Sequence, residues 1–127
     1  MNVVDSSGWL EFFGEGANAA IFAQPIEGVR ELIVPSIIVY EVYKLMNRQR
    51  GIRFALRAVN AMQLGTVIDL TTELAIASAE VSLRESLPMA DSIILATSRA
   101  YDATLWTQEA DFANISGVKY IARKESP

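Results

Sequence analysis

Five acidic residues occupy positions from which carboxylates could act together on a bound ion. Asp5 directly follows an apolar run at the N-terminus, and Glu109 and Asp111 follow another apolar run near the C-terminus. Glu41 and Asp91 lie on the apolar faces of two segments with helical spacing. Carboxylates crowded into one cleft repel each other and lose hydration, which raises their pKa values unless a divalent cation neutralises them. Oxygen ligands of this kind suit Mg²⁺ or Mn²⁺.

The composition removes most other catalytic chemistries. The chain has 127 residues and contains no Cys and no His. This excludes disulfides, zinc sites built on thiolate or imidazole, and Ser or Cys nucleophiles that are served by a His base. Any hydrolytic chemistry must therefore rest on carboxylates, Lys or Tyr.

Each acid also has a purely structural explanation. Glu41 stands three residues after Ile38 and four before Leu45, so it could be a partly exposed acid at the edge of an apolar face. Asp91 falls in the first turn of its helix, where the macrodipole favours a negative charge. Burying a carboxylate on an apolar stripe is costly unless it is paired or binds a cation. Because several such positions occur in one chain, we favour a shared site.

The basic residues are concentrated in one acid-free segment. The chain has 11 basic and 15 acidic residues and a formal charge of −4, so bulk charge does not favour nucleic-acid binding. Residues 42–68 contain no Asp or Glu but hold five of the 11 basic residues, namely Lys44, Arg48, Arg50, Arg53 and Arg57. Two i,i+4 pairs among them share helix faces, which predicts a basic rim that could hold phosphates. Ordinary solvated helix faces are the alternative.

The elements that must position these residues alternate between strands and helices. Apolar runs predict five strands, at residues 1–5, 32–34, 66–70, 103–107 and 118–121. Apolar residues at helical spacing predict helices after Ser7, from Ser36 to Gly51, from 54 to Gly65, after Thr71 and from Pro88, with Ser7, Ser36 and Thr71 as N-caps. This alternation indicates an α/β three-layer sandwich with a mostly parallel five-stranded sheet. The length fits a single domain over residues 1–127, with residues 123–127 as a frayed tail.

Four segments together resemble a known family. The start VVDSSGWLEFF, the segment PSIIVYEVYKL, the run LPMADSIILATSRAYDATLWTQEADF and the closing VKYI resemble, in order and spacing, the PIN domain, and specifically the VapC-type toxins of toxin–antitoxin pairs. The resemblance spans nearly the whole chain. It implies a metal-dependent endoribonuclease with a parallel sheet in the order 3-2-1-4-5 and an acidic pocket at the carboxyl edge of that sheet.

The resemblance also assigns the residues of this pocket. Asp5 matches the strand-one acid of the family, Glu41 its helix Glu, Asp91 the acid at its AD helix start, and Glu109 with Asp111 its last acidic element. The family usually has Asp or Asn where this chain has Glu109, which leaves open whether Glu109 or Asp111 is the fourth acid.

The matched residues imply a metal-dependent mechanism. Asp5 and Asp91 would hold one Mg²⁺ or Mn²⁺, and Glu41 would ligate it through water or orient that water. A second ion near Glu109 and Asp111 could stabilise the leaving oxygen, so one or two ions could act. Ser6 and Thr107 match small hydroxyl positions that support the pocket, although both could be ordinary turn and strand-end residues.

The resemblance further implies partners. They are an RNA substrate, a small antitoxin whose C-terminal segment blocks the pocket, and a second copy of the chain in a homodimer. The N-terminus has no basic leader and no run of about 18 apolar residues occurs, so we expect a cytoplasmic protein without a membrane span.

Two other interpretations stay open. One is an acidic-pocket phosphatase, although the D-x-D nucleophile signature is absent because Asp5 is followed by Ser6 and Ser7. The other is a PIN-fold binding module without catalytic activity.

Overall fold

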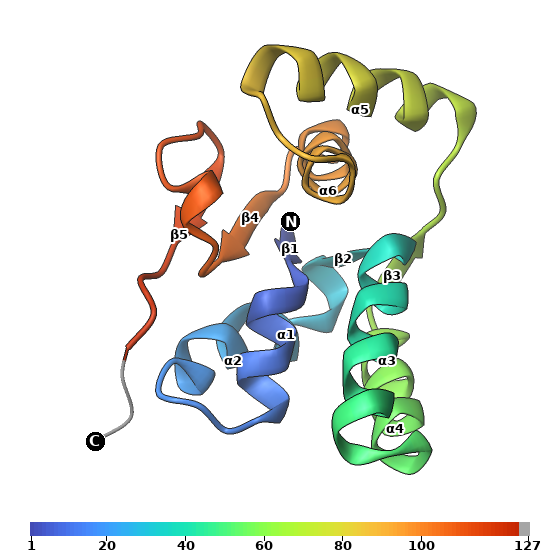
Figure 1. Ribbon diagram of the computed structural model, residues 1–127, viewed down its shortest axis with the longest axis vertical. Coiled ribbons are helices and arrows are strands. Elements are labelled where there is room, and N and C mark those ends of the chain that lie inside the picture. Colours follow the sequence, from blue (N-terminus) through green and yellow to red (C-terminus); the bar gives the residue numbers. More distant parts are fainter. Residues whose placement is uncertain (125–127) are drawn as a thin grey trace.

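The computed structural model describes residues 1–124, which contain a five-stranded parallel sheet (Figure 1). Its strands are β1 (Asn2–Val4), β2 (Leu32–Pro35), β3 (Thr66–Ile68), β4 (Thr104–Thr107) and β5 (Val118–Tyr120), in the spatial order β3-β2-β1-β4-β5. All four pairings between neighbours are parallel. The predicted sheet, its strand order and its parallel character are confirmed.

Helices cover both faces of the sheet. Within the described residues they are α1 (Ser6–Phe13), α2 (Ala19–Glu27), α3 (Ser36–Arg50), α4 (Ile52–Met62), α5 (Thr72–Glu85) and α6 (Met89–Ala100), with two short 3₁₀ turns, η1 (Val29–Glu31) and η2 (Ala110–Phe112). α6 packs on β2 and β4 at one face, whereas α2 packs on β1 and α1 on β4 at the other (Figure 1). α5 packs on α6, and α3 and α4 form a hairpin beside β3. The predicted three-layer sandwich is confirmed.

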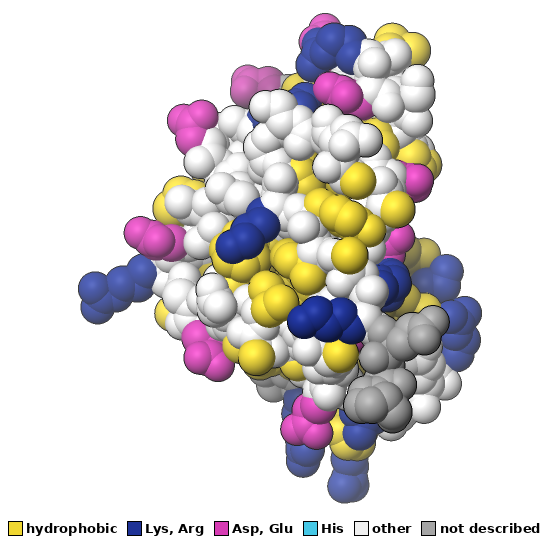
Figure 2. Space-filling model, turned by 90° about the vertical axis from the view of Figure 1, so that its left-hand side faces the viewer, with side chains coloured by type: hydrophobic (Ala, Val, Ile, Leu, Met, Phe, Trp, Pro, Cys, Tyr) yellow, Lys and Arg dark blue, Asp and Glu magenta, His cyan; other side chains and the backbone are white. Residues whose placement is uncertain are grey.

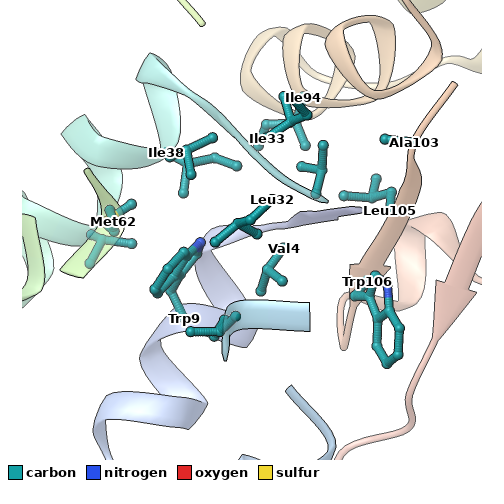
Figure 3. Packing of buried hydrophobic residues seen from close by; sticks show 14 of the residues in the cluster. Val4, Trp9, Leu32, Ile33, Ile38, Met62, Ile94, Ala103, Leu105 and Trp106 are labelled. Atoms are coloured by element: carbon teal, nitrogen blue, oxygen red, sulfur yellow. The ribbon is translucent and has the colours of Figure 1, made fainter. Parts of the chain in front are cut away.

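The central strands are buried on both faces. Val3 and Val4 of β1 pair with Leu105 and Trp106 of β4, and all four side chains are buried. Figure 3 shows Trp9 on one side of these strands and Ile94 of α6 on the other. Burial from both sides explains why the strands are continuous apolar runs in the sequence.

The structure contains one helix that the sequence analysis missed. The sequence patterns indicate no element between Phe13 and Leu32, where the structure places α2 and η1. Pro25 lies inside α2, and a proline in a helix removes a backbone donor, so it is normally a signal against a helix. Burial of Phe22 and Ile26 outweighs that local preference.

Of the three predicted N-cap residues, one is correct and two are wrong. Thr71 caps α5, because its Oγ1 accepts a hydrogen bond from the backbone N–H of Leu74 at 3.2 Å. Ser7 does not cap α1; Asp5 does, and Ser7 lies inside the first turn. Ser36 is likewise the first residue of α3, with Pro35 at the N-cap. In both wrong cases the helix begins earlier than the hydroxyl pattern indicated.

The ends predicted for other elements differ from the structure in one case and agree with it in another. β3 ends at Ile68 rather than at residue 70. Gly51 ends α3 as predicted and has φ 87°, a conformation that glycine adopts without strain. The predicted tail begins at Arg123, which the structure describes, whereas residues 125–127 lie outside the described residues.

Gly8 marks the closest approach of α1 to its neighbours, and its substitution should destabilise the fold. A Cβ at this position would lie 2.6 Å from Val4 Cγ1 and 2.7 Å from Phe22 Cδ1. We expect Gly8→Ala to lower the free energy of unfolding by about 1–3 kcal/mol, the usual cost of overpacking, in urea denaturation. In the control Gly28→Ala, the added Cβ would meet nothing closer than 3.6 Å. An equal effect of the two substitutions would contradict this account.

Candidate active site

The site begins where β1 and β4 end side by side. The backbone N–H of Asp5, directly after β1, donates to the carbonyl of Trp106 at 3.1 Å. The side chain of Asp5 is only 2% exposed. Its Oδ1 accepts from the Ser7 hydroxyl at 2.6 Å and from the Gly8 backbone N–H at 3.0 Å, and its Oδ2 accepts from Thr107 Oγ1 at 2.5 Å. These bonds use three of about four acceptor positions of a carboxylate.

Burial sets the ionisation of Asp5. Desolvation raises its pKa from 3.8 to about 6, because a charged carboxylate is disfavoured away from water. The hydrogen bonds from Ser7, Thr107 and Gly8 act in the opposite direction, and the charge of Glu109 adds a smaller increase to this pKa. Asp5 is therefore a fixed carboxylate with an unusually high proton affinity, a common feature of functional sites.

The same hydroxyls fix the loop that follows β4. Ser7 Oγ accepts from the backbone N–H of Gln108 at 3.1 Å, and Thr107 Oγ1 accepts from that of Glu109 at 2.9 Å. Asp5 and Glu109 are thereby held by one hydrogen-bonded group. The sequence predicts Thr107 as a supporting residue, but it predicts Ser7 only as an N-cap. The second of two consecutive serines after the strand-end acid was the available signal.

Glu41 reaches the site from α3. Its Oε1 accepts a hydrogen bond from the Ser6 hydroxyl at 3.1 Å. Desolvation raises the pKa of this half-buried carboxyl, the Ser6 bond lowers it, and the charge of Glu109 raises it further. Ser6 therefore contacts a candidate acid, which is the supporting position that the sequence predicted.

Asp91 lies in the first turn of α6, where three other carboxylates act on its pKa. Desolvation raises its pKa to about 6, and the charges of Glu41, Asp111 and Glu109 each raise it further. Asp111 is exposed in η2, directly before the buried Phe112. The four acids expected beside Asp5 therefore act on one another electrostatically, although they come from α3, α6 and the segment after β4.

The donor set suits a divalent cation, but the side chains do not form a closed coordination group. All candidate ligands are carboxylates, the ligand type that Mg²⁺ and Mn²⁺ prefer. Desolvation is the largest cause of the raised pKa values of Asp5, Glu41 and Asp91, and repulsion from neighbouring acids raises them further. A cation would relieve this repulsion. Within residues 1–124, however, no three of them lie close enough together to hold one ion.

The five basic residues of segment 42–68 are exposed on the α3–α4 hairpin. In the described part of the chain, none of them forms an ion pair with an acid. Lys44 and Arg48 line the same hollow as Glu41 and Tyr40. Arg53 and Arg57 lie on α4, and nothing places them beside the acids. Figure 2 shows basic side chains at the lower end of the molecule, the height at which Figure 1 places the ends of α3 and α4.

The structure is a three-layer sandwich with carboxylates at the carboxyl edge of its parallel sheet. Comparison of the sequence with known families identifies the class of protein that has this arrangement. A family model of the PIN domain matches residues 3–118, so the chain belongs to the PIN domain family. No curated protein sequence matches the chain significantly. No helix within residues 1–124 is long and apolar enough to span a membrane.

Solved structures share the fold. A toxin–antitoxin complex from Klebsiella pneumoniae is 23% identical with a TM-score of 0.79, and the match covers 94% of this chain and 96% of that one. VapC20 of Mycobacterium tuberculosis, described as a toxin that cleaves the sarcin–ricin loop, is 18% identical with a TM-score of 0.76, over 91% and 95%. A DNA-bound VapBC from Salmonella typhimurium is 14% identical with a TM-score of 0.71, over 96% and 98%. These likenesses establish a VapC-like fold.

The raised pKa of Asp5 predicts that the metal-free protein loses stability as the pH rises. The folded pKa of about 6 exceeds the unfolded value of 3.8, so the folded state binds more protons between them. The contribution is fully present below the unfolded value and is lost as the pH passes the folded value. It amounts to on the order of 3 kcal/mol. Urea denaturation in chelator, from about pH 4.5 to 7.5, should show this decline, and a rising profile would contradict it.

Proposed function

We propose that the chain is a divalent-metal-dependent endoribonuclease and the toxin of a type II toxin–antitoxin pair, formed by a single PIN-like domain over residues 1–127. The observation that carries the proposal is that Glu109, in a loop held by the same hydroxyls that bind the buried Asp5, acts electrostatically on Asp5, Glu41 and Asp91. Membership of the PIN domain family and the VapC-like fold support it.

In this proposal Asp5 and Asp91 hold Mg²⁺ or Mn²⁺. Glu41 orients a water molecule, and Asp111, with Glu109, serves a second ion if two are used. When bound, the cation lowers the pKa of water and stabilises charge that develops on the phosphate oxygens. The chain's own contribution is positional. Ser7 and Thr107 hold the Asp5 carboxylate, and Ser6 holds that of Glu41.

The substrate in this proposal is RNA, and the basic side of α3 guides it to the acids. Lys44 and Arg48 share a hollow with Glu41, so a phosphate chain that reaches Glu41 passes these two cations. Tyr40 is 62% exposed beside them and could stack on an unpaired base. Arg50, Arg53 and Arg57 continue the basic surface along the hairpin.

The partners in this proposal are a small antitoxin and a second copy of the chain. Several solved structures of the same fold are toxin–antitoxin complexes. An open groove between α3 and α4, lined by Tyr40, Tyr43, Leu56 and Val59 among others, offers an apolar surface for an antitoxin segment. A homodimer would bury exposed apolar residues such as Ile76 and Leu83 of α5.

A PIN-fold binding module without catalysis is the second candidate. The observation in its favour is that no three acids converge on one point within the described residues. Glu109, where the family usually has Asp or Asn, is consistent with it. Cation binding without RNA cleavage would identify this function.

Asp91→Asn should abolish metal-dependent cleavage without loss of the fold. Loss of a direct ligand should lower the rate by about 100-fold or more, since even outer-shell partners of a metal site contribute 10–100-fold. The measurement is cleavage of a mixed cellular RNA pool with Mg²⁺ or Mn²⁺ added or chelated. Glu73→Gln is the matched control, because Glu73 lies in the first turn of α5. Retained metal-dependent cleavage by Asp91→Asn would overturn the assignment.

Removal of the two cations that share a hollow with Glu41 should weaken RNA binding. We expect Lys44→Gln with Arg48→Gln to lower the affinity for single-stranded RNA and to reduce the salt dependence of binding by about 1.4 in slope, about 0.7 for each lost phosphate contact. Fluorescence anisotropy at several salt concentrations measures both. Arg30→Gln with Arg84→Gln removes the same charge from η1 and α5 and is the control. Equal losses in the two double variants would indicate a general charge effect.

A further inference from the structure

Arg123 places a positive charge against the acidic site. Its Nη2 donates to Glu109 Oε1 at 2.6 Å. Glu109 in turn acts on the pKa values of Asp5, Glu41 and Asp91. Arg123 and Glu109 line one hollow together with Ser6 and Ser7, the two hydroxyls that hold candidate acids. Among the ion pairs of residues 1–124, this is the one that involves a candidate site acid.

Hydrogen bonds hold the residues just before Arg123 in place. The backbone N–H of Ile121 donates to the carbonyl of Thr107 at 2.8 Å. The Asn18 Nδ2 donates to the carbonyl of Ala122 at 3.0 Å and also to Gln108 Oε1 at 3.0 Å. Asn18 is fully buried. In Figure 1 the chain leaves β5 and runs down on the side of the sheet where α1 and α2 lie. Arg123 therefore starts from a fixed point beside the site.

The ion pair itself adds little to stability. The side chains of Arg123 and Glu109 are 59% and 46% exposed, and exposed pairs contribute about 0–1 kcal/mol. A guanidinium has five N–H donors, and hydrogen bonding to Glu109 engages Nη2. The exposed remainder can donate to a further anion. Guanidinium groups suit phosphate because their parallel donors match its oxygens.

We propose that Arg123 is a positioning residue that binds a phosphate of the RNA substrate beside the acidic site. This inference rests on the proposed ribonuclease function. A polyanion must approach several carboxylates, and a tethered cation at their margin offsets that repulsion at little cost in conformational entropy. The buried Asn18 and the strand-end Thr107 supply the tether, and Glu109 orients the guanidinium.

The test compares the full chain with Arg123→Gln, Arg123→Lys and Lys124→Gln. Lys124→Gln removes the same charge one residue further on and is the matched control. Binding of a short single-stranded RNA is measured by fluorescence anisotropy in chelator at several salt concentrations. We expect Arg123→Gln to weaken binding roughly tenfold and to reduce the salt slope by about 0.7. Arg123→Lys should restore most of the affinity, and the thermal unfolding temperature should stay unchanged.

The outcomes separate this inference from the function on which it rests. A wild-type chain that cleaves RNA while Arg123→Gln binds RNA unchanged, or no more weakly than Lys124→Gln, overturns the role of Arg123 alone. Faster cleavage by Arg123→Gln would mean that the guanidinium blocks the site, and it would overturn the role as well. A wild-type chain that neither binds nor cleaves RNA with Mg²⁺ or Mn²⁺ overturns the proposed function and this inference together.

Discussion

The carboxylate of Asp5 is buried between β1, α1 and β4, where the Ser7 and Thr107 hydroxyls and the Gly8 backbone N–H hold it. A buried carboxylate without such donors would be strongly destabilising, so the strand, the helix start and the neighbouring strand must all be in place together. Asp5 directly follows β1 and is the N-cap of α1. The close packing of Gly8 against Val4 fixes how that helix leaves the sheet. The position of Glu109 follows from this junction, because the parallel pairing of β1 with β4 sets where the segment after β4 begins.

The fold then brings further acids toward this junction from independent directions. Glu41 comes from α3, Asp91 from α6 and Glu109 from the loop after β4. The charges of Glu41 and Glu109 raise the pKa of Asp91, and that of Glu109 also raises the pKa values of Asp5 and Glu41. Packing of the sandwich core, not attraction among these side chains, holds them near one another. When a hydrophobic core holds like charges close together, their repulsion destabilises the folded protein, and binding of a cation would remove this repulsion. This repulsion is the physical reason for proposing a cation at the site.

The sequence predicts the sheet well because its strands are buried on both faces and therefore form continuous apolar runs. It predicts the acids because carboxylates stand out on apolar helix faces, as at Glu41. The strand order came from family resemblance, since parallel runs of similar length carry no order of their own. The missed features depend on partners distant in sequence: Ser7 contacts Thr107 and Gln108, and Asn18 anchors Ala122. Apart from the second serine after Asp5, no local pattern signals such contacts. Pro25 is a local signal against α2, but burial of one face of that helix outweighs it.

The distribution of charge allows a chain with a formal charge of −4 to be proposed as an RNA-binding protein. The candidate site acids are gathered at one edge of the sheet, and cations line two hollows there: Lys44 and Arg48 from α3, and Arg123 from the segment after β5. At physiological salt, charges interact over about 8 Å, so an approaching phosphate responds to this local pattern rather than to the net charge. The cations on α3 are not paired with acids in the described residues, whereas Arg123 is held by Glu109. In the proposed function, the cations of α3 would attract the chain of an RNA, and Arg123 would fix a single phosphate relative to the carboxylates.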